Sequence, residues 1–147
     1  MESLKKENNA QRMINVLVID NTDSIKPDLS DDGLNITLCK DEVQALNAVE
    51  KKQPSVVLLN YSVRKEQTAE YIKLIRSVNT DSKVVVIAKE LTEQQIVECL
   101  IAGAKGYQQQ KQLNEYIEKL ITVIDAGEAW ITRRMVAILL DKLLENN

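Results

Sequence analysis

The chain alternates short, apolar segments with segments of helical periodicity, and this alternation limits the folds available to it. Segments 55–60 (SVVLLN) and 83–88 (KVVVIA) are rich in β-branched residues and apolar on both faces. Strands of that kind are typical of parallel sheets covered by helices on both sides. Segments 14–20, 34–39 and a short stretch at 104–109 complete five candidate strands. The order predicts an α/β fold with a doubly wound, five-stranded parallel sheet.

Four segments between and after the strands have apolar residues at helical spacing, and a further helical segment follows them. Asp41 and Thr92 stand at N-cap positions, and Gly103 and Gly127 stand where two helices are expected to end. The segment after the first strand differs, because Pro27 interrupts it and no apolar stripe can be drawn. We expect a loop there with at most a turn or two, hence a shortened first helix. The predicted helices cover 41–52, 68–78, 92–103, 113–127 and 128–145.

Size and composition are those of one globular domain. The chain has 147 residues, of which 44% are apolar and 3% aromatic, so we expect an aliphatic core. A formal net charge of −3 argues against direct nucleic-acid binding by this chain. Cys39 and Cys99 form no paired motif, and no segment approaches the ~20 apolar residues of a membrane span. We therefore expect reduced thiols, no membrane contact and a cytoplasmic location.

The predicted elements divide the chain into three parts. Residues 1–13 are polar, lack an apolar signal segment and are expected to form a flexible tail. Residues 14–127 hold the strands and helices of the domain. Residues 128–147 form a C-terminal helix that serves in dimerisation or as a linker.

Several segments resemble the receiver domains of bacterial two-component response regulators. The strands VLVID, VVLLN and VVVIA and the stretch AGAKGY (102–107) occur in that family's order. Ala88 and Tyr107 lie 19 residues apart, which matches the family's spacing between its switch hydroxyl residue and its switch aromatic. The segment GEAWITRRMVAILLDKL resembles the region after the receiver in the LuxR/NarL-type subfamily. The resemblance covers roughly residues 14–144 and implies the flavodoxin-like receiver fold.

The resemblance assigns a role to each polar position at the carboxyl ends of the strands. In the family, two acids and an acceptor aspartate hold Mg²⁺, and the acceptor attacks phosphorus. A lysine and a hydroxyl residue then support the phosphoryl group. By this resemblance Asp20 keeps the first acid and Tyr107 keeps the switch aromatic. The other positions are changed: Asn21 replaces the second acid, Asn60 the acceptor, Ala88 the hydroxyl residue and Gln110 the lysine, with Lys111 as its neighbour.

These replacements predict a degenerate phosphoacceptor pocket. A carboxamide is not a usable nucleophile, and few carboxylates leave little repulsion for Mg²⁺ to neutralise. We therefore expect no catalytic residue, metal or cofactor, and a phosphorylation-independent pseudo-receiver that acts through protein–protein interaction or dimerisation in a bacterial two-component or transcription-regulation pathway. The alternative is a phosphorylatable receiver of a LuxR-type DNA-binding regulator that uses displaced residues, such as Lys111 in place of the lysine. An enzyme that binds a nucleotide cofactor is disfavoured, because the four glycines form no GxGxxG or Walker pattern.

Simpler structural roles are also open to the pocket residues. Asn60 is expected to bond to loop amides, and Asp20 to accept hydrogen bonds from loop N–H groups. Tyr107 is expected to hold one packed position, with a rotating switch as the alternative. The amides at 108–110 need hydrogen-bond partners, which water or a second chain can supply.

The C-terminal segment is more apolar than a helix packed on one side requires. One side can cover its own domain, and the remainder would be exposed in a monomer, which is typical of an association surface. A two-fold homodimer is the expected form, with a signalling protein as a second candidate partner. The predicted interface residues are Trp130, Ile131, Met135, Ile138, Leu139 and Leu143.

Overall fold

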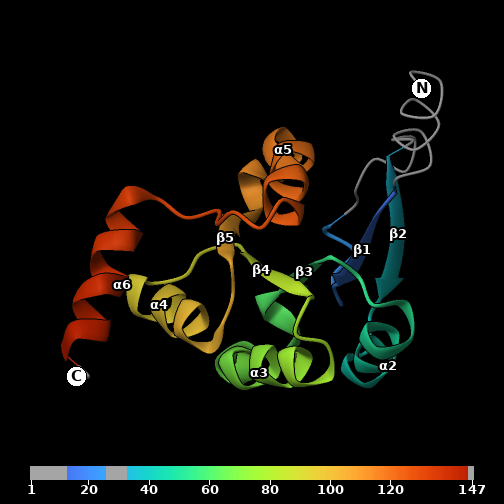
Figure 1. Ribbon diagram of the computed structural model, residues 1–147, viewed down its shortest axis with the longest axis horizontal. Coiled ribbons are helices and arrows are strands. Elements are labelled where there is room, and N and C mark those ends of the chain that lie inside the picture. Colours follow the sequence, from blue (N-terminus) through green and yellow to red (C-terminus); the bar gives the residue numbers. More distant parts are fainter. Residues whose placement is uncertain (1–12, 26–32, 146–147) are drawn as a thin grey trace, which may run out of the picture.

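The structure, a computed structural model, describes residues 13–25 and 33–145. Five parallel strands form one sheet in the order β2-β1-β3-β4-β5 (Figure 1). The predicted doubly wound sheet is therefore confirmed. The strands are β1 (Ile14–Ile19), β2 (Leu34–Cys39), β3 (Val56–Asn60), β4 (Lys83–Ala88) and β5 (Gly106–Gln109). The α-helices are α2 (Glu42–Lys52), α3 (Thr68–Val78), α4 (Glu93–Ala102), α5 (Leu113–Asp125) and α6 (Arg133–Glu145).

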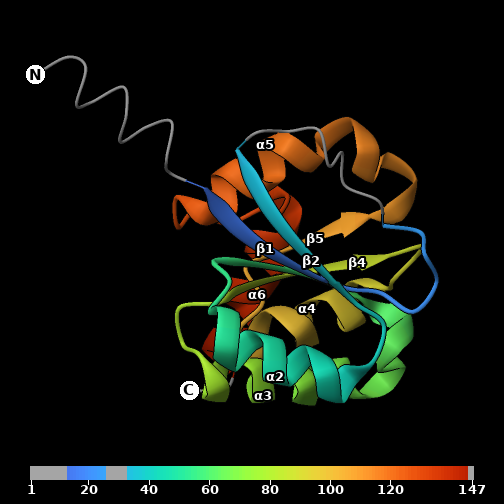
Figure 2. The same cartoon turned by 90° about the vertical axis from the view of Figure 1, so that its right-hand side faces the viewer.

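Helices cover both faces of the sheet, which explains why the central strands have no polar face. Helices α2, α3 and α4 lie on one face and α5 lies on the other (Figure 2). Alternate residues of each central strand enter the two cores: Leu59 packs toward α3, while Leu58 packs toward α5. Every residue of β3 is buried.

The helix ends agree with the capping residues in the sequence. The Asp41 carboxylate accepts hydrogen bonds from two N–H groups in the first turn of α2. Thr92 and Gln95 form a reciprocal capping box at the start of α4. Gly103 ends α4 with φ +117°, a left-handed conformation that favours glycine. The predicted boundaries of α2, α3 and α4 are thus confirmed to within a residue or two.

The connection after β1 contains no helix in the part that the structure describes. Residues 20–25 follow an irregular path, and Ile25 turns inward to join the core beneath α5. Residues 26–32, which include Pro27, and the tail 1–12 lie outside the described residues.

The prediction of a helix from Glu128 is wrong, because α6 begins at Arg133. The preceding segment is extended, and Trp130 forms a parallel bridge with Gly106 at the free edge of β5. The Trp130 N–H donates to the Lys105 carbonyl, and the Tyr107 N–H donates to the Trp130 carbonyl. Thr132 then caps α6, since its hydroxyl accepts from the Met135 N–H at 3.1 Å.

This extended segment carries the chain across the edge of the sheet. Helix α6 consequently lies beside α4, on the face opposite α5 (Figure 1). Its inner side supplies Met135 to the core, with Ile138 and Leu139 packed against the same cluster. Arg134 pairs with Glu93 of α4 through two hydrogen bonds of 2.7 and 2.9 Å.

Candidate functional site

The carboxyl ends of β1, β3 and β4 border a small cavity. Because β1 and β3 are neighbours while their connections leave in different directions, this is the topological switch of the sheet, where α/β proteins commonly place a site. The cavity has a volume of about 270 Å³. Its lining comprises Thr22, Asn60, Tyr61, Ser62, Ala88, Lys89, Glu90 and Gln110.

Asp20 lies at the inner end of this region and is fully engaged by hydrogen bonds. Its Oδ1 accepts from the Thr22 N–H at 2.9 Å, from the Thr22 hydroxyl at 2.7 Å and from Asn60 Nδ2 at 2.9 Å. Its Oδ2 accepts from the Ile25 N–H at 2.9 Å. Burial opposes ionisation, but these four bonds outweigh it and lower the pKa of the carboxyl.

Asn60 links the ends of β3 and β1. Its Nδ2 donates to Asp20, and its Oδ1 accepts from the Ser62 N–H at 3.0 Å. The orientation of the amide follows from these partners, because a carboxylate can only accept and an N–H can only donate. The expected bond from Asn60 to a loop amide is present, and the bond to Asp20 was not anticipated.

A second hydrogen bond spans the mouth of the site. Ser62 Oγ donates to Asn21 Oδ1 at 2.6 Å, and this hydrogen bond is exposed to solvent. The side chains of Asp20, Asn60 and Thr22 form the inner layer, and those of Asn21 and Ser62 form the outer one. Thr22 and Ser62 were not predicted as site residues from the sequence. Short hydroxyl residues directly after a strand often form hydrogen bonds with loop groups, and this signal could have identified them.

The remaining predicted residues fall into two groups. Ala88 is buried at the end of β4, and Gln110 lies in the cavity wall. Lys111 is exposed and is not part of the lining, whereas Lys89, which follows Ala88 at the end of β4, is part of it. The structure therefore brings together Asp20, Asn21, Asn60, Ala88 and Gln110 and leaves Lys111 outside.

Tyr107 lies on β5 with its ring packed against the core beneath α4. Burial raises the pKa of its phenol, partly offset by a backbone interaction with Leu91. The side chain points inward, and the cavity lining does not include it.

The resemblance to the receiver family implies Mg²⁺ at this site. Magnesium takes octahedral oxygen ligands at about 2.0–2.1 Å, usually including one or two carboxylates. Here Asp20 directs both oxygens at hydrogen-bond donors, and Asn60 presents its amino group to the same place. Residues 13–25 and 33–145 contain no cluster of three acidic, cysteine or histidine side chains suited to a metal ion. The residues present do not fit the ion.

The Asp20 network makes stability depend on acid pH. The folded pKa of this carboxyl lies below its unfolded value of about 3.9, so the unfolded state binds more protons as the pH falls. The stabilisation is complete above the unfolded pKa and is lost as the pH falls through the lower folded pKa. We expect Asp20→Asn to lower the free energy of unfolding by about 2 kcal/mol at neutral pH. Urea unfolding of both proteins should show this difference shrinking below about pH 4, and a constant difference would contradict the assignment.

The fold and the site define a class: a doubly wound α/β domain with a pocket at its topological switch. Residues 16–123 match the family model for the response regulator receiver domain. The match covers most of the chain, and the chain belongs to this family.

Individual proteins agree with this assignment. The chain is 30% identical over 100 residues to a Pseudomonas aeruginosa protein described as a candidate transcriptional regulator. The aligned region covers 65% of this chain and 48% of the relative. The chain therefore spans about half the length of that relative.

Solved structures with the same fold include a LuxR-family two-component response regulator from Aurantimonas sp. SI85-9A1. It has a TM-score of 0.73 and 13% identity, over 90% of this chain and 99% of that one. A LuxR-family DNA-binding response regulator from Silicibacter pomeroyi has a TM-score of 0.65 and 18% identity, over 83% and 99%. A response regulator from Thermotoga maritima has a TM-score of 0.64 and 24% identity, over 75% and 98%.

Proposed function

We propose that this receiver domain signals without phosphorylation, through protein–protein contact, in a bacterial two-component or transcription-regulation pathway. One observation carries the proposal: the side chain at the acceptor position, Asn60, donates its amino group to Asp20 at 2.9 Å. A carboxamide nitrogen has its lone pair delocalised into the carbonyl, and the amide oxygen carries no negative charge. Neither atom replaces the carboxylate that attacks phosphorus in nucleophilic catalysis.

The surroundings of Asn60 support the same function. Transfer of a phosphoryl group needs positive charge and hydrogen-bond donors aimed at the phosphoryl oxygens. Ala88 has no hydroxyl to offer, and Gln110 is neutral where the family has a lysine. The hydrogen-bond network of Asp20, Asn60 and Ser62 instead holds the loops after β1 and β3 in one arrangement. We infer that this face works as a static surface whose output follows partner binding, ligand binding in the pocket or protein abundance.

A phosphorylatable receiver that uses displaced residues is the second candidate function. Lys89 and Glu90 both line the cavity, and Glu90 supplies the one carboxylate among the described residues of its lining. Both are exposed side chains at the rim. This function requires Glu90 to take the phosphoryl group that Asn60 cannot accept.

Incubation with acetyl phosphate and Mg²⁺ distinguishes the two functions. We expect the intact mass of the chain to stay unchanged, and beryllofluoride with Mg²⁺ to leave the amide NMR spectrum unchanged. The Glu90→Gln variant is the matched control, because it removes the displaced acceptor while leaving Asn60 in place. A phosphoryl adduct on the wild type that disappears in Glu90→Gln would establish the second function and overturn the first.

The wider setting is proposed on the same basis. We propose a cytoplasmic module that is not an enzyme, does not itself bind DNA and contacts a signalling protein or a second copy of itself. Among the described residues, no helix has the length and apolar character to span a bilayer. The description of the Pseudomonas aeruginosa relative as a candidate transcriptional regulator suggests that this receiver influences gene expression through such contacts.

A further inference from the structure

Helix α6 has two apolar faces, and its own domain covers only one of them. The inner face carries Met135, Ile138 and Leu139, which pack with α4. Five of the six residues predicted for a partner interface are therefore used within the chain, and that prediction is corrected. Trp130 contributes to the α5-side cluster and Ile131 to the α4-side cluster, so Leu143 alone of the six stays exposed.

The outer face of α6 is formed by a second apolar stripe. It follows the spacing i, i+4, i+7, i+8, which places its members on one side of a helix. The stripe lies about 100° around the helix axis from Met135 and Leu139, because Val136 and Leu140 each follow one of them by a single residue. The stripe consists of Val136, Leu140, Leu143 and Leu144, with 38%, 54%, 45% and 72% of their surfaces exposed.

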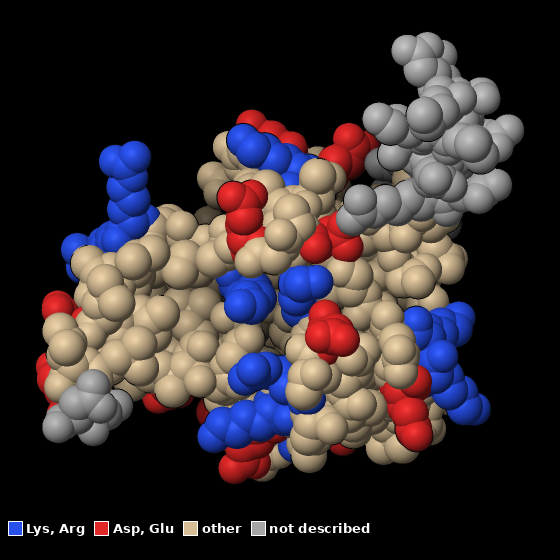
Figure 3. All heavy atoms as spheres, in the orientation of Figure 1, with Lys and Arg blue, Asp and Glu red and all other residues tan. Residues whose placement is uncertain are grey.

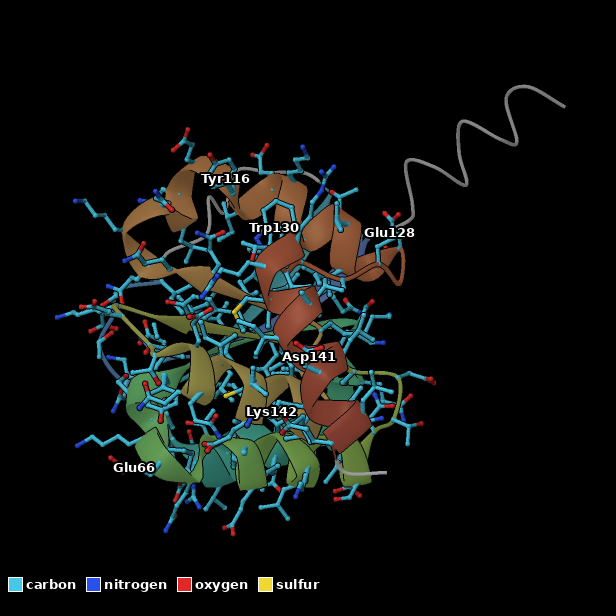
Figure 4. All side chains as sticks on the ribbon, turned by 90° about the vertical axis from the view of Figure 1, so that its left-hand side faces the viewer. Glu66, Tyr116, Glu128, Trp130, Asp141 and Lys142 are labelled. Carbon is cyan, nitrogen blue, oxygen red and sulfur yellow. The ribbon has the colours of Figure 1, made fainter. Side chains whose placement is uncertain are left out.

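The stripe is held in a fixed orientation. Trp130 Nε1 donates to Gln108 Oε1 at 2.9 Å, and its ring lies 6.2 Å from that of Tyr116 on α5. Figure 4 shows Trp130 near Tyr116, at the end of the molecule where α6 starts. Met135 and the Arg134–Glu93 pair then hold the first turns of α6 on α4. A surface that is already ordered loses less conformational entropy when a partner binds.

The charges at the start of α6 oppose its helix dipole, and those at its end are mixed. Its first turn carries Arg133 and Arg134 and no acid, although the N-terminus of a helix favours negative charge. Asp141 and Glu145 lie toward the C-terminal end, which favours positive charge, and Lys142 lies between them and pairs with Glu145 at 3.8 Å. Figure 3 shows basic side chains over the start of α6, acidic ones at its outer edge and a largely uncharged surface between them. A second helix packed in the opposite direction would bring the basic start of each helix beside the end of the other, where the two acids outnumber the one lysine.

We propose that the outer stripe binds a second copy of this chain, with the two α6 helices antiparallel about a two-fold axis at Leu140. In this register Leu140 meets Leu140 of the second copy. Val136 faces Leu144, and Ala137 faces Leu143, so each small residue opposes a large one. Arg133 lies over the C-terminal turn of the other helix. Such a pair is isologous, because one patch serves both protomers.

The inference deepens the proposed function, since it names the surface through which the module associates. It depends on the exposed face of α6 and uses no residue of the pocket. A monomeric chain would therefore leave the phosphorylation-independent site untouched, and a phosphorylated chain would leave the dimer untouched.

Sedimentation equilibrium of the full chain tests the association. We expect a concentration-dependent dimer in the wild type and at least a tenfold rise in its dissociation constant for Leu140→Lys, because two like charges would meet at the axis. Leu38→Lys is the matched control: Leu38 is 58% exposed and lies on β2, at the opposite edge of the sheet (Figure 1). A monomeric wild type at the highest soluble concentration, or equal effects of the two variants, would overturn the inference.

Cysteine crosslinking tests the antiparallel orientation. Leu140→Cys should form an intermolecular disulfide, because its two copies face each other across the axis. Two copies of Val136→Cys would lie about 12 Å apart along the helices and should not crosslink with each other. The wild type measures the background from Cys39, the thiol that is not fully buried. Crosslinking of Val136→Cys as fast as Leu140→Cys would rule out the proposed register.

Discussion

Asn60→Asp should destabilise the folded chain by about 3 kcal/mol at neutral pH in the absence of divalent ions. The new carboxylate would place an oxygen about where Asn60 Nδ2 now lies, 2.9 Å from Asp20 Oδ1. An attractive hydrogen bond is then replaced by repulsion between two buried charges. Neither strand end can retreat, since β1 and β3 are paired along their length.

The pH dependence of this variant should have the opposite sign from that of the wild type. Two adjacent carboxyls share a proton, so one acquires a folded pKa above its unfolded value. Between these two values the folded state binds more protons, and stability falls as the pH rises. The wild type instead loses stability as the pH falls through the depressed pKa of Asp20. Addition of Mg²⁺ should restore part of the lost stability only in Asn60→Asp, since a cation can then lie between two carboxylates.

Urea unfolding at two pH values, with and without Mg²⁺, measures all of these effects. The matched control is Asn35→Asp, because Asn35 also donates its amide to a neighbouring strand, at 2.9 Å to Asn15 Oδ1, but at an exposed site. Asn15 is neutral and can turn its own amide to donate, so this variant should change stability little. Equal effects of the two substitutions would show that Asn60 and Asp20 are not coupled as described.

Gly106→Ala should detach the segment that leads to α6 and lower stability by about 3 kcal/mol. A Cβ at this position would lie 2.4 Å from the Trp130 carbonyl oxygen and 2.8 Å from the Trp130 Cβ. The Trp130 carbonyl belongs to the backbone and cannot move aside as the end of a flexible side chain can. The β-bridge between Gly106 and Trp130 must therefore open. Two backbone hydrogen bonds and the packing of Trp130 are lost with it.

The tryptophan itself reports this change, because Trp130 is the only one in the chain. We expect its fluorescence in Gly106→Ala to shift toward that of a solvated indole under native conditions, and the urea midpoint to fall. Gly127→Ala serves as the control: Gly127 has φ +91°, but no atom lies within 4 Å of its added Cβ. Gly127→Ala should lower the free energy of unfolding by about 1 kcal/mol through backbone strain and leave the packing of Trp130 unchanged. Unchanged Trp130 fluorescence in Gly106→Ala would contradict the role given to Gly106.

Much of the fold could be predicted because its causes are local. The apolar segments around Leu58 and Val85 have no polar face, which requires a sheet covered on both sides. Asp41 and Thr92 begin helices through their own side chains, and Gly103 ends one through its backbone. The start of α6 was misplaced because Trp130 and Ile131 fit a helical apolar pattern equally well. The Thr132 cap was the local signal that could have corrected it.

The candidate site was predicted in position but not in its bonding. The carboxyl ends of neighbouring parallel strands meet at one edge, so Asp20 and Asn60 had to lie near each other. The partners of Asp20 could not be deduced, since Thr22 and Ile25 reach it only through the path of the loop after β1. The link between Ser62 and Asn21 likewise joins two loops that are 41 residues apart in sequence.

The sequence alone determined the parallel sheet and the helix caps, because side-chain type and local spacing are sufficient for both. The tertiary structure decided which groups meet across the pocket and which side of α6 stays exposed. Those outcomes depend on contacts between distant segments. The extended pairing of Trp130 with Gly106 sets where α6 lies, and burial of Met135 against α4 leaves the stripe around Leu140 facing the solvent.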